Sequence, residues 1–146
     1  MEHPALPVDA DAAAPAGTPH VLTAVAAGGA LGSAGRRLVA EVVPAAGGFP
    51  WPTFVVNLSG ALLIGVLMVA VTEVVTGRPL LRPFVGIGLL GGWTTFSAYA
   101  LEARDLVAAG ALASALLYVV GSVVGGLLAT WAGIAALRRA TERRQG

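Results

Sequence analysis

Four long apolar segments joined by short connections constrain this chain more than any other feature. They lie at about 20–43, 51–75, 80–108 and 111–137. A helix needs about 20 apolar residues to cross about 30 Å of hydrocarbon, and each segment is long enough. The connections carry turn-forming Gly and Pro residues. We therefore predict an all-α membrane protein whose channel domain, residues 20–137, has four transmembrane helices.

The composition supports a membrane protein and excludes several function classes. Hydrophobic residues make up 56% of the chain and charged residues only 12%, whereas a soluble domain carries about 25% charged residues. The net charge of +1 gives no basic field for nucleic acid. The absence of Cys excludes disulfides and thiolate chemistry. We find no nucleophile–base pair or metal-ligand set, so the sequence does not indicate an enzyme, and membrane lipid is an expected partner.

The two ends of the chain differ from the apolar segments. Residues 1–19 are rich in Ala, Pro and Asp and predict a disordered tail, without the pattern of a signal peptide. Residues 138–146 predict a basic tail at the membrane surface. If both ends are cytoplasmic, six Arg lie on that side and three on the other. This bias favours termini inside but does not exclude insertion in both orientations.

Glycines and hydroxyl residues interrupt the third apolar segment. Gly86, Gly88, Gly91 and Gly92 precede the string WTTFS. Irregular backbone at membrane depth survives only inside protein or beside a water-filled cavity, and such breaks recur at ion sites in transport proteins. We predict a third helix broken in mid-membrane. The alternative is a Gly-rich helix packed tightly against a neighbour.

Polar and aromatic side chains recur at helical spacing within three of the segments. They are Thr53 and Asn57, Tyr118 and Ser122, and Phe96, Tyr99 and Glu102. Spacing of three or four residues puts the members of each group on one side of a helix. Each hydroxyl could instead bond only to its own helix or to a neighbouring one.

Glu102 and Arg36 are the charged residues of most interest. In hydrocarbon, Glu102 must face a polar interior, find a partner or be protonated, unless it lies near the surface beside Arg104 and Asp105. Arg36 follows Gly32 by four residues and could draw anions into a vestibule. Snorkelling to the headgroups is the alternative, and we expect it for Arg37 more than for Arg36.

These residues alone indicate a channel or transporter for a small solute. A proton-coupled exporter of the small multidrug type is the main rival, but the first segment lacks an unshielded carboxylate. A non-transporting helper subunit would need no line of polar side chains.

Three strings resemble a known family in order and spacing. GGWTTFSAYALE (91–102) resembles the GGxTTFSTFSxE signature of the Fluc (CrcB) fluoride channels. GGALGSAGR (28–36) is similar to that family's GGxxGAxxR segment, and TFVVNLSG (53–60) is similar to its TLxVNxxG segment. The resemblance covers about residues 22–137.

The resemblance implies an antiparallel, dual-topology homodimer with two narrow pores that passively exports fluoride across the cytoplasmic (inner) membrane. It implies that Asn57 contacts the ion near the pore entrance and that Arg36 lies in the vestibule. Phe96 and Tyr99 would line the path. Thr53, Tyr118, Ser122 and Glu102 would form a polar track. A structural Na⁺ at the dimer interface would be held by the backbone carbonyls of Gly91 and Thr94.

The sequence departs from the family pattern at several positions. Tyr99 stands for the second signature Phe, Ala98 for Thr, Ala100 for Ser, and Ser33 for Ala. Tyr99 keeps a ring and adds a hydroxyl, which predicts conduction at an altered rate. The alternative to a homodimer is a heterodimer with a paralogous subunit.

Overall fold

The described part of the chain, residues 19–75 and 77–145 of a computed structural model, is helical and contains no strand. The predicted N-terminal tail lies outside the described residues except for Pro19. The segments in chain order are α1 (Pro19–Val42), α2 (Trp51–Val69), η2 (Ala70–Val74), η3 (Arg82–Leu90), α3 (Gly91–Trp93), α4 (Phe96–Ala108) and α5 (Leu112–Gln145). The two η segments are π-helical. The all-α prediction is therefore confirmed.

Three helical stretches are long and apolar enough to cross a membrane: Trp51–Val74, Arg82–Ala108 and Leu112–Arg143. The first helix, α1, has 24 residues but does not reach the same apolarity. Its Gly residues and its two adjacent Arg lower its mean hydropathy, although its length would suffice.

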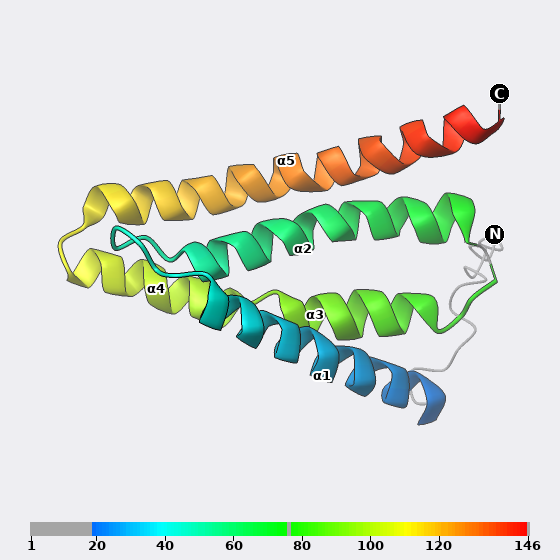
Figure 1. Cartoon of the computed structure of the whole chain (residues 1–146), viewed down its shortest axis with the longest axis horizontal. Coiled ribbons are helices and arrows are strands. Elements are labelled where there is room, and N and C mark those ends of the chain that lie inside the picture. The colour runs from blue at the N-terminus through cyan, green and yellow to red at the C-terminus, as the bar shows by residue number, and fades with distance from the viewer. Residues whose placement is uncertain (1–18, 76, 146) are drawn as a thin grey trace, which may run out of the picture.

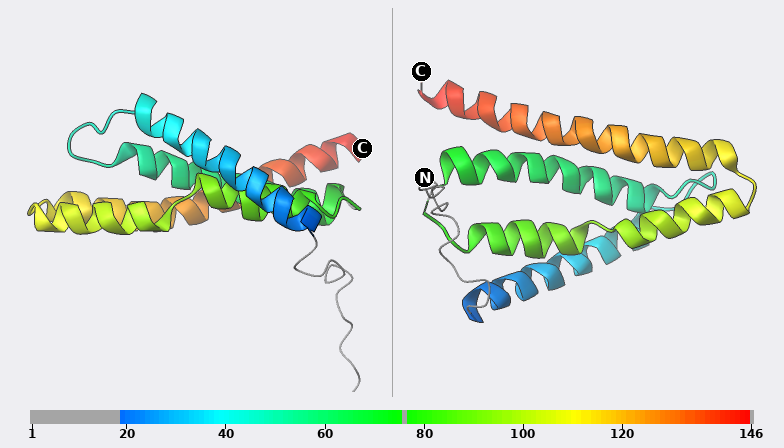
Figure 2. Two further views of the ribbon diagram at one scale, coloured as in Figure 1. Left: turned by 90° about the horizontal axis from the view of Figure 1, so that it is seen from below. Right: turned by 180° about the vertical axis from the view of Figure 1, so that it is seen from behind.

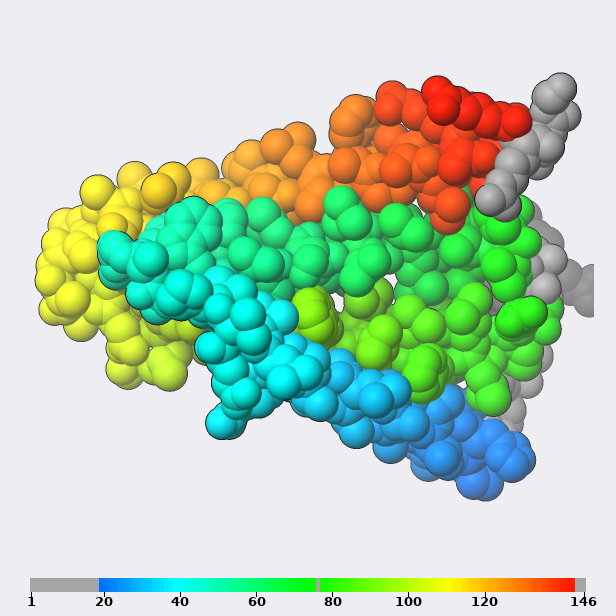
Figure 3. Space-filling model, viewed as in Figure 1, coloured from blue at the N-terminus to red at the C-terminus, as the bar shows by residue number. Residues whose placement is uncertain are grey.

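The helices run alternately in opposite directions, so the start of α1 (blue) and the end of α5 (red) lie at the same end of the molecule (Figure 1). The second and last helices lie side by side, and α1 crosses η3 and α3 obliquely (Figures 1 and 2). In the space-filling view, openings pass between α2 and η3 (Figure 3). The chain by itself is therefore incompletely packed at its centre.

Glycines allow the helices to approach closely. A Cβ at Gly28 would collide with the carbonyl oxygen of Phe84, and one at Gly32 with that of Leu89. Gly65 of α2 and Gly133 of α5 make equally close approaches to the facing backbone. Such small-residue contacts are how membrane helices pack without a hydrophobic driving force.

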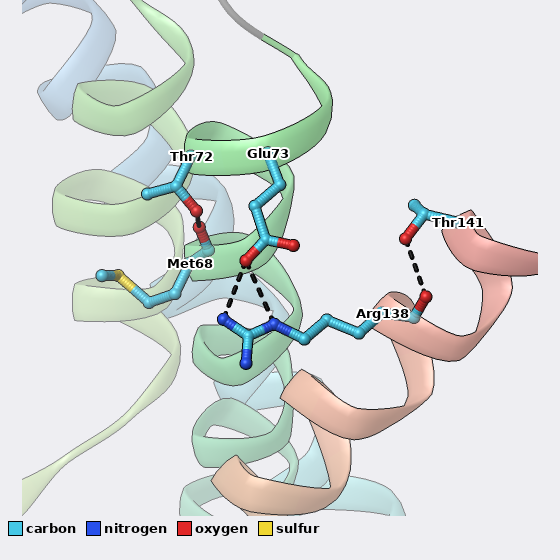
Figure 4. A network of polar contacts seen from close by, with 5 residues as sticks. All are labelled: Met68, Thr72, Glu73, Arg138 and Thr141. Atoms are coloured by element: carbon cyan, nitrogen blue, oxygen red, sulfur yellow. Dashed lines mark hydrogen bonds and ion pairs between the residues drawn. The ribbon is translucent and has the colours of Figure 1, made fainter. Parts of the chain in front are cut away.

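The last helix extends beyond the predicted span end at residue 137 and continues to Gln145. Near its end, Arg138 donates from Nε and Nη2 to Glu73 Oε1, at 3.1 and 2.8 Å (Figure 4). This exposed ion pair joins the extension to η2, next to the Thr72–Met68 and Thr141–Arg138 hydrogen bonds. Exposed pairs of this kind contribute at most about 1 kcal/mol.

Two residues separate α3 from α4. Thr94 has φ −78° and ψ 157°, and Thr95 has φ −147° and ψ 118°, both extended. The hydroxyl of Thr95 accepts from the amide of Ala98 at 3.2 Å and so caps the start of α4. Below, Thr94 and Thr95 are called the interruption.

Candidate functional site

Asn57 holds the backbone of the interruption. Its Nδ2 donates to the carbonyl of Thr95 at 3.1 Å, and the Thr95 amide donates to its Oδ1 at 2.9 Å. An extended residue between two helices lacks its helical partners, and a buried backbone group without a partner is costly. The side chain of α2 supplies both of these hydrogen bonds.

The two adjacent arginines of α1 have different partners. Arg36 is partly buried, and its Nε donates to the carbonyl of Gly92 at 3.0 Å. Arg37 is exposed and pairs with Glu41 one turn later, at 2.9 Å. Arg36 thus contacts Gly92 within Arg82–Ala108, the stretch that corresponds to the predicted third membrane helix, whereas Arg37 stays on its own helix.

Trp93 and Thr95 were not identified as site residues from the sequence. The indole Nε1 of Trp93 donates to the carbonyl of Val56 at 3.0 Å and to Ser59 Oγ at 2.9 Å. Two signals could have found them. A Trp within an apolar span needs a partner for its N–H, and a Thr directly before an apolar helical run is a typical N-cap.

Glu102 is the meeting point of three helices. Thr53 of α2 donates to Oε1 at 2.8 Å, and Tyr118 of α5 donates to Oε2 at 2.7 Å. Tyr118 is 0% exposed and Thr53 is 8% exposed. Arg104 pairs instead with Asp105, at 2.8 Å. Of the sequence-based alternatives for Glu102, the structure shows the one in which it has partners.

Aromatic rings continue from this cluster in both directions. The Tyr99 ring lies 5.3 Å from that of Tyr118 and 5.8 Å from that of Phe96, between centroids. Phe96 is 79% exposed in this chain. On its other side, Tyr118 packs against Phe49 at 5.4 Å and Phe54 at 6.4 Å. Phe96, Tyr99, Tyr118 and Glu102 therefore form a connected row along α4 and α5.

The hydroxyls of Tyr99 and Ser122 are weakly engaged. Tyr99 OH lies 3.5 Å from the carbonyl oxygen of Val119, at the outer limit for a hydrogen bond. Ser122 Oγ is buried and has no hydrogen-bond partner in the described part of the chain. Both can therefore donate to a ligand.

The Gly91 carbonyl, one of the two predicted to hold Na⁺, lacks the amide partner that it would have in a continuous helix. In a continuous helix the amide of Thr95 would donate to the Gly91 carbonyl, but here it is bound by Asn57. A Cβ at Gly91 would meet nothing within 4 Å, so this face of the helix is open. Within residues 19–75 and 77–145, no cluster of His, Cys, Asp or Glu could serve as an alternative metal site. Unwound backbone carbonyls are a known kind of Na⁺ ligand in membrane helices.

The sequence-predicted residues thus form two groups. Thr53, Glu102 and Tyr118 are in direct contact, with Tyr99 and Phe96 beside them. Arg36 and Asn57 contact the interruption and the residue before it instead. The donors present, an amide N–H and several hydroxyls, are those that a small, strongly hydrated anion needs in place of water.

Comparison with known proteins gives consistent results. Residues 23–134 match the family described as CrcB-like protein, Camphor Resistance (CrcB). The chain is 47% identical to "Fluoride-specific ion channel FluC 2" of Nocardia farcinica, over 92% of this chain and 96% of the relative. It is 46% identical to "Fluoride-specific ion channel FluC 1" of Streptomyces coelicolor, over 86% of this chain and 82% of the relative.

Proposed function

This chain belongs to the CrcB family, and from that membership we propose that it is a fluoride-specific ion channel of the cell inner membrane. The channel passively exports fluoride and so lowers its concentration in the cytoplasm. The relatives are named as ion channels, so the family is not one of enzymes. The comparisons do not favour an exporter of organic cations.

One observation in the structure carries the proposal: Thr53 and Tyr118 both donate to Glu102 between apolar helices. Polar groups are costly within a membrane and are retained where they serve an ion path. Ser122, one turn beyond Tyr118, adds a buried hydroxyl without a partner in the described residues. Fluoride would exchange water for these donors, and Glu102 would accept hydroxyl hydrogens when the ion is absent.

The proposed path continues through the aromatic rings. Phe96 and Tyr99 can present ring edges, which carry the positive part of the aromatic quadrupole, to a passing anion. Asn57 has a second amide hydrogen beyond the one given to Thr95, and this hydrogen is available near the entrance. Arg36 lies beside this region, on α1.

We propose that the working unit is an antiparallel, dual-topology homodimer in which the interruption lies at membrane depth near the centre. The ring of Phe96 and the face at Gly91 are open. A second copy would cover them, and the Gly91 and Thr94 carbonyls of both copies would hold a structural Na⁺ between them.

The main test is fluoride efflux from liposomes that contain the purified protein, followed with a fluoride electrode and compared with chloride efflux. We expect fluoride to leave and chloride to stay. If folded protein alone carries no fluoride, the homodimer proposal fails. Flux that begins only when a paralogous subunit is added would establish the heterodimer instead.

Topology can be tested separately because the chain has no Cys. A single A109C substitution places a thiol in the exposed connection between α4 and α5. A membrane-impermeant thiol reagent, applied to intact cells, should label about half of the copies if both orientations occur, as symmetry of an antiparallel pair requires. Complete or absent labelling would contradict dual topology, and the Cys-free chain is the control.

A further inference from the structure

We propose that Arg36 is a positioning residue for the interruption in the third membrane helix. Its Nε–H replaces the backbone donor that the Gly92 carbonyl loses there and so fixes the direction of the carbonyls around it. The family resemblance implies a different role, attraction of anions into a vestibule. The step from this backbone to the Na⁺ site and the flux readout below rest on the proposed function, whereas the hydrogen-exchange readout does not.

At the interruption, two backbone hydrogen bonds of a continuous helix are replaced by bonds to side chains, one of them that of Arg36. A continuous helix would pair the Gly92 carbonyl with the amide of Phe96, and the Gly91 carbonyl with the amide of Thr95. In the structure the Gly92 carbonyl accepts from Arg36 Nε at 3.0 Å. The Thr95 amide donates to Asn57 Oδ1 at 2.9 Å. Arg36 of α1 thus replaces the amide donor to the Gly92 carbonyl, and Asn57 of α2 replaces the acceptor for the Thr95 amide. The Gly91 carbonyl is left without the Thr95 amide as its partner.

The packing of α1 brings Arg36 to this carbonyl. A Cβ at Gly32 would collide with the Leu89 carbonyl oxygen, and one at Gly35 would lie 2.8 Å from the Trp93 ring. A Cβ at Gly92 would collide with the carbonyl oxygen of Gly29. Because small residues line both sides of this crossing, α1 lies close enough for the partly buried Arg36 to reach across it.

Arg37 provides an internal contrast. Its side chain is 79% exposed and pairs with Glu41 on its own helix. If α1 needed only positive charge at this depth, either arginine would supply it. Only Arg36 contacts the third membrane helix, and it does so through Nε, the atom bonded directly to Cδ.

Because the donor is Nε, substitutions of Arg36 can separate the effect of its hydrogen bond from the effect of its charge. Gln carries its amide nitrogen on Cδ, as Arg carries Nε, so R36Q keeps a donor at the same position without the charge. Lys carries its nitrogen one bond further out, so R36K keeps the charge but not the donor position. R36M removes both. R37Q is the matched control for the loss of one arginine charge.

Two readouts are needed: fluoride flux and hydrogen exchange of the amides in residues 91–98, measured on the purified protein in NaCl. For R36M we expect about tenfold faster exchange in 91–98 and about tenfold lower flux, the effect of losing one charge-assisted hydrogen bond. R36Q should restore both to within about threefold of the parent, and R36K should restore them less. R37Q should change neither.

The opposite pattern would overturn the proposal. If R36Q is as impaired as R36M while R36K retains flux, charge rather than backbone positioning is the role of Arg36. If R36M does not fold, the comparison of R36Q with R36K still decides. Hydrogen exchange does not depend on conduction, so a parent protein without fluoride flux would refute the proposed function and leave this test intact.

The link to Na⁺ has its own measurement. Replacing NaCl by N-methylglucamine chloride should speed exchange in residues 91–98 of the parent and of R37Q. In R36M the cation should make little difference, because the carbonyls are no longer held in place. An equal Na⁺ effect in R36M and the parent would show that Arg36 does not organise the cation site.

Discussion

Asn57 and Thr95 are joined by a closed pair of hydrogen bonds, in which Nδ2 donates to the carbonyl at 3.1 Å and the amide donates to Oδ1 at 2.9 Å. The same side chain that the family resemblance assigns to the ion therefore also holds the backbone of the third membrane helix. One amide hydrogen of Asn57 serves Thr95 and the other can serve an anion.

Substitution of Asn57 should impair both structure and conduction. N57A removes both bonds to Thr95 and should lower the free energy of unfolding by about 1–3 kcal/mol for each backbone group left without a partner. Fluoride flux should fall at least about tenfold. N57D keeps an acceptor for the Thr95 amide but places an oxygen against its carbonyl, so it should also lose flux.

Ser59 gives the control for Asn57. Its hydroxyl accepts from Trp93 Nε1, which also donates to the carbonyl of Val56. S59A should therefore be within about 0.5 kcal/mol of the parent. Thermal unfolding in detergent and liposome flux measure the two effects, and an N57A protein with parental stability would contradict the pairing with Thr95.

Glu102 and Tyr118 should be energetically coupled. Y118F removes a hydrogen bond of 2.7 Å to the carboxyl of Glu102, and E102Q changes the same contact from the other side. In a double-mutant cycle of unfolding free energies we expect a coupling of about 1–3 kcal/mol. Y99F is the control, because the Tyr99 hydroxyl lies 3.5 Å from its nearest acceptor. Additive effects of Y118F and E102Q would contradict a direct interaction.

Phe96 should matter for conduction more than for the fold of the subunit. Its ring is 79% exposed, so F96A should change the stability of one subunit by no more than about 0.5 kcal/mol. If the ring lines the path, fluoride flux should still fall several-fold. L101A on the same helix removes an exposed side chain on another face and should leave flux unchanged. Equal flux in F96A and the parent would remove Phe96 from the path.

Two glycines give a test of the dimer. An added methyl at Gly32 collides with backbone atoms of η3 and α3 within one subunit, so G32A should destabilise the fold by about 1–3 kcal/mol. At Gly91 a Cβ meets nothing within 4 Å. G91A should therefore leave the subunit intact but weaken the dimer if that face is covered by a second copy. The dimer fraction across a dilution series in detergent measures this, and an unaffected dimer would argue against a central position for Gly91.

Sequence patterns predicted the positions of the helices well but not their partners. Helices begin at Trp51 and end at Ala108, the residues at which the second predicted segment begins and the third ends, because Pro, Gly and apolar run lengths are local signals. The sequence predicted a basic surface tail after residue 137 without assigning it a structure, and the structure shows that the helix continues there to Gln145. Its Arg and Ala residues are good helix formers, and Arg138 gains Glu73 as a partner on η2.

By itself, the sequence determined that this chain is a bundle of apolar helices with polar side chains at helical spacing, since hydropathy and periodicity act over a few turns. Only the tertiary structure decided which of those side chains meet. Glu102 accepts a hydrogen bond from Thr53, which lies 49 residues away in the sequence, and Arg36 donates to the carbonyl of Gly92, 56 residues away. Such contacts depend on how closely the helices cross. That distance is set by glycines on both partners together, which no single segment of sequence reveals.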